Sequence, residues 1–126
     1  MLCYSFLEKR GDYIKKVINW QLISNNNEVI NNKCVECEFQ NNIIEYKEDK
    51  FTINIIDLNK NIYKRENEEF IFEIDFNNRL LNYKLKKEEL SIENAQVDAE
   101  IIKSDTLIHL KYSLGEEKKE IIIQLL

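Results

Sequence analysis

The clearest candidate for chemistry in this chain is a C-x-x-C pair, Cys34 and Cys37, in the stretch "NKCVECEFQNN". Two cysteines at this spacing can bind zinc or form a redox pair. A structural zinc needs four ligands. The Cys and His side chains of the whole chain are Cys3, Cys34, Cys37 and His109, so all of them would have to converge on one ion.

The same stretch alternates as a β-strand does, which separates the two thiols. Successive strand side chains point to opposite faces, so Cys37 shares an apolar face with Val35 and Phe39, whereas Cys34 lies on the face of the glutamates. We therefore interpret both cysteines as structural residues, and we expect no metal and no cofactor. Cys34 should react with a thiol reagent in the native protein, whereas Cys37 should need denaturant.

No other residues form a recognisable catalytic set. His109 is the only histidine and falls on the polar face of its expected strand, and a histidine base needs a nucleophile or an orienting acid nearby. Gly11 and Gly115 are the only glycines, which excludes the glycine-rich phosphate motifs. Paired glutamates such as Glu88 and Glu89 are typical of solubilising charge. We therefore predict no catalytic residue and no enzymatic activity.

The elements that would position these residues are strands, because apolar residues recur with a period of two. This alternation is typical of half-buried antiparallel strands. The residues expected to point inward from five of the strands are Ile18, Trp20 and Leu22; Phe51, Ile53 and Ile55; Phe70, Phe72, Ile74 and Phe76; Leu81, Tyr83 and Leu85; and Ile108, Leu110, Tyr112 and Leu114.

Asparagine clusters at 25–27, 41–42, 59–61 and 77–78 separate the strands. Asparagine tolerates positive φ and can make turns in a chain without proline. Two segments, residues 4–10 and the stretch "KKEELSIEN", could be helical. The predicted fold is all-β: a single antiparallel up-and-down β-barrel domain over residues 1–126, with a β-sandwich as the alternative and at most one or two short helices.

The interior of such a barrel would be lined by large side chains. Trp20, Phe72, Tyr83 and Tyr112 are the candidate residues for binding a ligand there, and the alternative is that they fill the core. Among the expected inward residues only Ala99 is small. We therefore expect a filled barrel with at most a shallow pocket at one mouth, and no tight binding of fatty-acid-like probes.

Composition excludes several classes of partner. The formal net charge is -5 and no basic block occurs, so we expect no nucleic acid as partner. No run approaches the roughly 20 apolar residues that span a bilayer, and the first residues lack the features of a signal peptide. Three cysteines do not make a disulfide framework. We therefore expect a cytoplasmic protein without membrane contact.

Two segments, "EIIIQLL" and "NIIDL", are apolar on both faces, which predicts self-association. In "EIIIQLL" one face carries Ile121, Ile123 and Leu125, and the other carries Ile122 and Leu126. One face can fill the barrel, but the other needs a cover. A symmetric homodimer is the commonest solution, and residues 1–10 are the expected cover in a monomer.

The stretches "IYKRENEEFIFEIDF" and, more loosely, 82–126 resemble a family of small uncharacterised bacterial proteins, the YwiB-like proteins of calycin type. The resemblance covers about two-thirds of the chain and concerns strand order more than identity. The chain departs from it in lacking a glycine after Arg65 and a Tyr-Gly turn near Tyr83. The resemblance implies a lipocalin-like barrel and supplies no activity and no catalytic residues.

Two functions are consistent with these observations. The first is a small, soluble, non-enzymatic structural or interaction protein that works as a homo-oligomer. The second is a lipocalin-like module that binds a small apolar or amphipathic ligand.

Overall fold

The computed structural model describes residues 8–10, 13–25 and 28–125 of the chain. These residues form β-strands and no helix, which confirms the all-β prediction. The strands are β1 (Glu8–Arg10), β2 (Tyr13–Ser24), β3 (Glu28–Gln40), β4 (Ile43–Lys47), β5 (Ile53–Asp57), β6 (Ile62–Glu66), β7 (Phe70–Asp75), β8 (Leu80–Leu85), β9 (Leu90–Gln96), β10 (Ala99–Lys103), β11 (Leu107–Leu114) and β12 (Glu117–Leu125).

All the described strands belong to one sheet, in the order β10-β11-β12-β2-β3-β4-β5-β6-β7-β8-β9, with β1 on the beginning of β2. Each strand from β2 to β9 pairs antiparallel with the next, β10 to β12 do the same, and β12 returns to β2. This is the order of an up-and-down barrel with one break, because β9 and β10 do not pair within the described residues.

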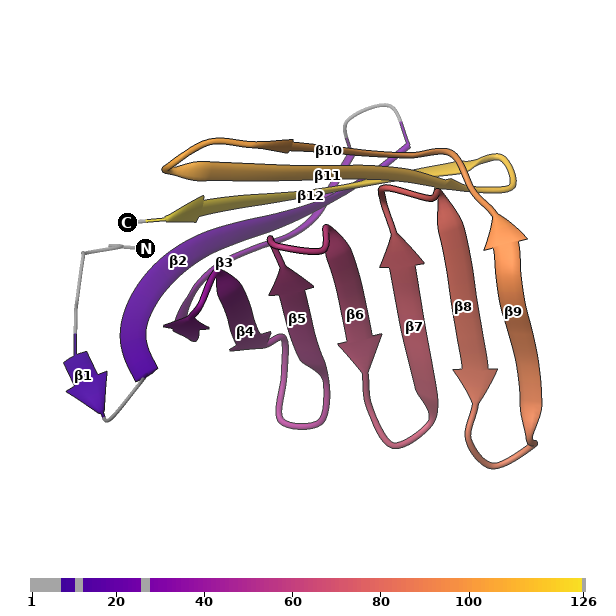
Figure 1. Cartoon of the computed structure of the whole chain (residues 1–126), viewed down its shortest axis with the longest axis horizontal. Helices are drawn as coiled ribbons and strands as arrows, with labels where there is room; N and C mark the ends of the chain where they lie inside the picture. Colours follow the sequence, from indigo (N-terminus) through magenta and orange to yellow (C-terminus); the bar gives the residue numbers. More distant parts are fainter. Residues whose placement is uncertain (1–7, 11–12, 26–27, 126) are drawn as a thin grey trace.

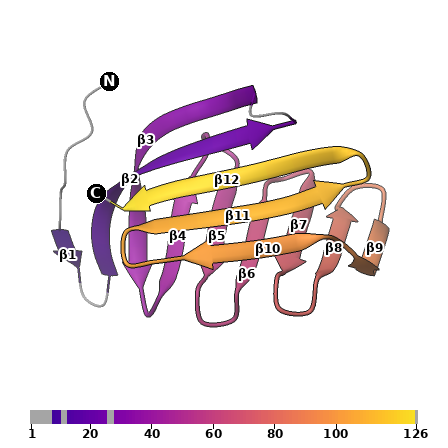
Figure 2. The same ribbon diagram turned by 90° about the horizontal axis from the view of Figure 1, so that it is seen from above.

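The sheet curls over itself into two layers, in which β10–β12 run across the strands β4–β9 (Figures 1 and 2). The long strands β2 and β3 take part in both layers. β3 pairs with β2 along most of its length but with β4 only through the segment 37–40. Long strands that bend from one layer into the other are the usual way to make such a corner. The barrel-like prediction is confirmed in this open, curled form.

The core lies between the two layers and consists of side chains from nearly every strand. Its fully buried members include Trp20, Ile44, Ile56, Tyr63, Ile74, Ile108, Leu110 and Ile123. Ile121 and Ile123 point inward as predicted, and Ile122 on the opposite face is half-buried. Leu126 lies outside the described residues. Ala99 is buried at the edge of this core.

Asparagine makes several of the turns, as predicted. Asn41, Asn42 and Asn61 adopt φ of 51, 62 and 56°. Their amide groups also bind neighbouring turns: Asn59 Nδ2 donates to the carbonyl of Asn41 at 2.7 Å, and Asn61 Nδ2 donates to Asn77 Oδ1 at 3.0 Å. Asparagine therefore replaces the glycine that such turns often use.

The predicted orientation of β5 is wrong by one residue. Phe51 is 68% exposed and Ile53 and Ile55 are only half-buried, whereas Thr52, Asn54 and Ile56 point inward. Both faces of "FTINIIDL" carry apolar residues, so alternation alone does not decide between them. The register with β4 and β6 decides, because it places Ile56 beside the buried Ile44 and Tyr63.

The helix suggested for "KKEELSIEN" is also wrong. Residues 86–89 form the turn between β8 and β9, and the rest belongs to β9. In the segment 4–10, residues 8–10 form β1, which pairs with β2, and residues 4–7 lie outside the described residues.

Candidate functional site

Three of the four predicted ligand-binding residues meet on the inner face of the sheet. The ring centroids of Phe72 and Tyr112 are 5.7 Å apart, and Tyr83 lies directly opposite Phe72 in the β7–β8 pair. Tyr63 contacts both Phe72 and Tyr112, and Phe70 contacts Tyr83, so these five rings form two contacting groups that meet at the Phe72–Tyr83 strand pair; together they are called the aromatic cluster. Trp20 does not join it.

Trp20 packs against Tyr46 instead, with the ring centroids 5.7 Å apart. It is almost fully buried, and its Nε1 has no hydrogen-bond partner among the described residues. A buried donor without a partner costs free energy.

Beside the aromatic cluster, the inner face carries a polar network. The Tyr63 hydroxyl donates to Asn54 Oδ1 at 2.6 Å, and Asn54 Nδ2 donates to Glu48 at 3.4 Å. Glu48 accepts two bonds from Arg65, one from Nε at 3.0 Å and one from Nη2. The Arg65 guanidinium lies 5.4 Å from the ring centroid of Phe70. The polar groups satisfy one another, as buried groups must.

Burial sets the protonation of the tyrosines in this region. Desolvation raises the pKa of Tyr46 and of Tyr63 well above the ordinary range, and it raises the pKa of Tyr112 to about 12. Burial alone would lower the pKa of Arg65, but the hydrogen bond and the charge of Glu48 outweigh it and raise the pKa. These phenols are therefore neutral and the guanidinium is charged at physiological pH.

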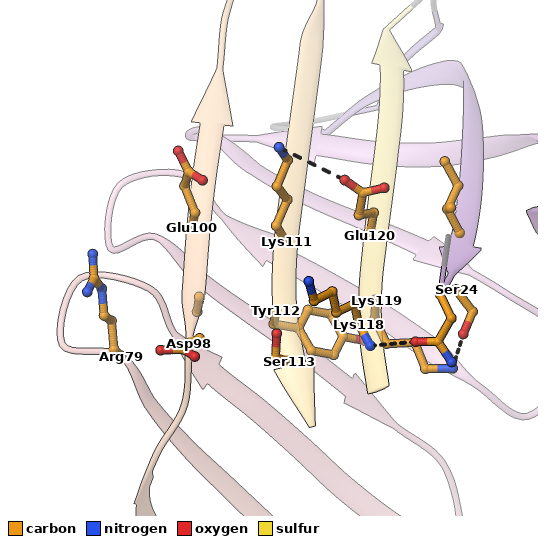
Figure 3. A pocket seen from close by; sticks show the side chains of 13 residues that line it. Ser24, Arg79, Asp98, Glu100, Lys111, Tyr112, Ser113, Lys118, Lys119 and Glu120 are labelled. Carbon is orange, nitrogen blue, oxygen red and sulfur yellow. Dashed lines mark hydrogen bonds and ion pairs between the residues drawn. The ribbon is translucent and has the colours of Figure 1, made fainter. Parts of the chain in front are cut away.

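A cleft of about 750 Å³ lies where β10, β11, β12 and the end of β2 come together with the β7–β8 turn (Figure 3). Arg79 and Asp98 stand at one side of it, and Glu100, Lys111 and Glu120 form a row across three strands. The cleft is lined by charges of both signs, so it suits a polar ligand better than an apolar one.

In the cleft, the hydroxyl of Ser24 lies beside the amine of Lys119. Lys119 Nζ donates to Ser24 Oγ at 3.1 Å, and it also lies 3.8 Å from a carboxylate oxygen of Glu117. A general base would have to accept the hydroxyl proton, whereas Lys119 is the donor and part of an ion pair. The geometry is that of a structural contact.

The two cysteines lie on opposite faces of β3, as predicted. Cys37 is buried in the core, and Cys34 is half-buried on the other face, where its Sγ accepts a bond from Asn19 Nδ2 at 3.7 Å. Cys34 takes part in a disulfide bond. The expectation that it reacts as a native thiol is therefore wrong, because a disulfide sulfur has no thiolate to offer.

His109 lies on the outer face of β11 opposite Ile122, and its Nε2 lies 3.2 Å from Oε1 of Glu120, its diagonal neighbour on β12. No nucleophile shares this contact. Among the described residues, no group of three or more His, Cys, Asp or Glu side chains is arranged to hold a metal ion.

The β9 edge is the other feature that stands out. β9 ends the strand order, and within the described part of the chain it pairs only with β8. Leu90 and Ile92 are 62% and 53% exposed on the inner face. Unpaired strand edges with exposed apolar side chains are sites where another chain can add.

Comparison of the chain with protein-family models, with curated proteins and with solved structures gives no significant match. In the described part of the chain there is no helix with the length and hydrophobicity needed to cross a membrane.

Sequence reasoning missed both the polar network and the β9 edge. The alternation of Phe51, Ile53 and Ile55 predicts that Asn54 lies on the outer face, so it does not predict the hydrogen bond between Asn54 and Tyr63. The sequence does not predict β9 as an edge strand, because "KKEELSIEN" contains several good helix formers and therefore suggests a helix. The break in the strand order depends on pairing between distant strands, which one sequence does not encode locally.

Proposed function

We propose that the protein is a non-enzymatic interaction protein that works as a homo-oligomer. The observation that carries this proposal is the β9 edge, where a strand that pairs on one side only among the described residues exposes Leu90 and Ile92. The interior supports it, since the space between the layers is occupied by large side chains. Among the residues that the structure describes, neither the cleft nor the inner face has a nucleophile hydrogen-bonded to a base.

Sedimentation equilibrium of the full chain tests the proposal. Between about 5 and 300 micromolar, the average mass should rise from the chain mass of 15.2 kDa towards twice that value, as a dimer of micromolar affinity requires. A monomer mass over the whole range would overturn the proposal.

The alternative is a lipocalin-like module for a small apolar or amphipathic ligand, as the resemblance to calycin-type barrels implies. One observation favours it: Tyr112 belongs both to the aromatic cluster and to the lining of the cleft. An amphipathic molecule could contact the cleft charges and this ring together. Isothermal titration with such a ligand and with a Tyr112→Ala variant would test it.

A cytoplasmic, bacterial origin is part of the same proposal and rests on composition and on the resemblance. The Cys34 disulfide argues against the cytosol, because disulfides are rare there. Counting thiols in the native and the reduced protein from its own host would decide the compartment.

A further inference from the structure

We propose that two copies of the chain associate through β9, which pairs antiparallel with β9 of the second copy around a two-fold axis at Ile92. This rests on the proposed homo-oligomeric function and names its interface. The evidence comes from the two free edges of the sheet, from the charges on β9 and from its exposure.

The two edges of the sheet differ in how they are protected. The β10 edge, "AEIIK", carries two charges in five residues. Lys103 Nζ also donates to the carbonyl of Leu58 and to Asn61 Oδ1, both at 2.7 Å, which ties the end of β10 to the β5–β6 turn. Charges and covering elements are the usual protection of an edge against pairing. The β10 edge is therefore protected against pairing with another strand.

The β9 edge, "LSIENAQ", carries a single charge in seven residues, and its first five residues are all exposed. A β-bulge near Asn94, which has φ of 53°, is its one protective feature and lies towards the end of the strand. The beginning of β9 lies away from β10 (Figure 1). The segment from Leu90 to Glu93 is therefore open to pairing.

Charge selects the register. Residues that face each other in an antiparallel pair must lie on the same face, so the two-fold axis passes through a residue. Axes at Ser91, Ile92 and Glu93 keep the pairing within the exposed beginning of β9, whereas an axis at Leu90 lies beside the β8–β9 turn and one at Asn94 lies on the bulge. Of the three, an axis at Glu93 places this carboxylate opposite its own copy, and an axis at Ser91 places it opposite Glu89 of the second copy. An axis at Ile92 places Glu93 opposite a Ser91 hydroxyl, so of these three registers only this one avoids like charges.

The same register joins the apolar side chains. Ile92 faces its own copy, and each Leu90 is diagonal to the other Ile92, within reach in a strand pair. Leu85 and Tyr83 lie beside them on β8. The strand pair alone buries less than the roughly 1,200 Å² of a standard stable interface, so we expect a dimer of micromolar affinity.

Two substitutions, one on each edge of the sheet, test the interface by sedimentation equilibrium of the full chain. Ile92→Lys places two ammonium groups face to face and should raise the dimer dissociation constant at least about tenfold. Ile102→Lys on β10 is the matched control, because Ile102 is 49% exposed and lies on the β10 edge, which is protected against strand pairing. It should leave the dissociation constant unchanged.

Two further variants carry opposite charges at one exposed position, Ser91, and keep the proposal testable if Ile92→Lys fails to fold. Ser91→Lys creates two attractive pairs with Glu93 and should tighten the dimer about 2- to 30-fold, whereas Ser91→Glu should weaken it by a similar factor. Equal effects of the two variants would overturn the register.

The outcomes also separate this proposal from the function it rests on. A dimer that survives Ile92→Lys but is lost in Ile102→Lys would overturn the β9 interface and leave the homo-oligomer in place. A wild-type chain that is monomeric at all concentrations would overturn both.

Discussion

Tyr63 and Asn54 show at the scale of single residues how a polar pair is accommodated inside a mostly apolar layer. The hydroxyl of Tyr63 is the donor that satisfies the buried Oδ1 of Asn54. Tyr63→Phe should therefore lower the free energy of unfolding by about 1–2 kcal/mol, because it leaves a buried acceptor unpaired. Urea denaturation measures this change.

Tyr83→Phe is the matched control, because Tyr83 is half-buried and its hydroxyl has no hydrogen bond to another described residue. It should change the free energy of unfolding by less than about 0.5 kcal/mol. Combining Tyr63→Phe with Asn54→Val should cost less than the two single changes together. Additive losses would show that the bond contributes nothing of its own.

The buried tyrosines predict a loss of stability in alkali. Burial raises the pKa of Tyr112 from 10.0 to about 12, so the unfolded chain loses this proton first, above about pH 10. The contribution of Tyr112 is present below that pH and is lost as the pH rises through its folded pKa. Urea titrations from about pH 8 to pH 12 should show stability falling above pH 10.

Tyr112→Phe is the variant that tests this cause. It removes the titrating group but keeps the ring against Phe72, so stability should fall less steeply with pH than in the wild type. An identical slope in both proteins would assign the alkaline loss to the other tyrosines or to the lysines.

At the scale of elements, the turns depend on residues other than glycine in the left-handed region. Glu89 has φ of 51° in the β8–β9 turn, and its side chain is exposed. This conformation costs an L-residue roughly 1 kcal/mol, a cost that glycine does not have. Glu89→Gly should therefore raise the free energy of unfolding by about 0.5–1 kcal/mol.

Lys87→Gly in the same turn is the control, because Lys87 has no positive φ. Glycine at this position only increases the conformational entropy of the unfolded chain. The free energy of unfolding of this variant should therefore equal that of the wild type or be lower. A stabilising effect of both variants would show that backbone strain at Glu89 is not the cause. Thermal denaturation of the two variants compares them directly.

The strands could be predicted from sequence wherever only one face is apolar. In β7 and β11 the alternation of Phe72 and Ile74, or of Ile108 and Leu110, identified the inward face correctly, although Leu114 at the end of β11 is exposed rather than buried. In β5 both faces carry isoleucine, so the orientation depended on neighbouring strands. In β9 the helix formers of "KKEEL" outweighed a short apolar alternation. The sequence pattern of a single segment therefore does not predict its orientation or its type of secondary structure where pairing with neighbouring strands determines them.

The same limit applies to the candidate site. Phe72, Tyr83 and Tyr112 are predicted as ligand-binding residues because they are large and point inward. In the structure, Phe72 contacts Tyr112, and Tyr83 lies opposite Phe72. Trp20 was chosen on the same ground but contacts Tyr46, because β2 bends between the layers and carries it to another part of the core. The curvature of a long strand is a property of the packed sheet, so a side chain's face is predictable and its neighbours are not.

At the scale of the whole molecule, the two proposed functions differ in what the space between the layers contains. Trp20, Tyr46, Tyr63 and Phe76 are buried there, in a core to which nearly every strand contributes side chains. A fatty acid would have to displace several of these rings. We therefore expect no saturable one-to-one quenching of Trp20 fluorescence by a fluorescent fatty acid at submicromolar concentration.

Trp20 suits this measurement, because it is the only tryptophan and sits in the core rather than in the cleft. Tyr63→Ala is the informative variant, since it removes a buried ring and opens a cavity that stays unfilled in a packed core. If the side chains fill the interior, the wild type should bind no probe, whereas the variant gains weak binding at the cost of stability. Tight binding by the wild type would instead mean that the layers separate to admit a ligand, and the binding module would then replace the interaction protein as the better account of the fold.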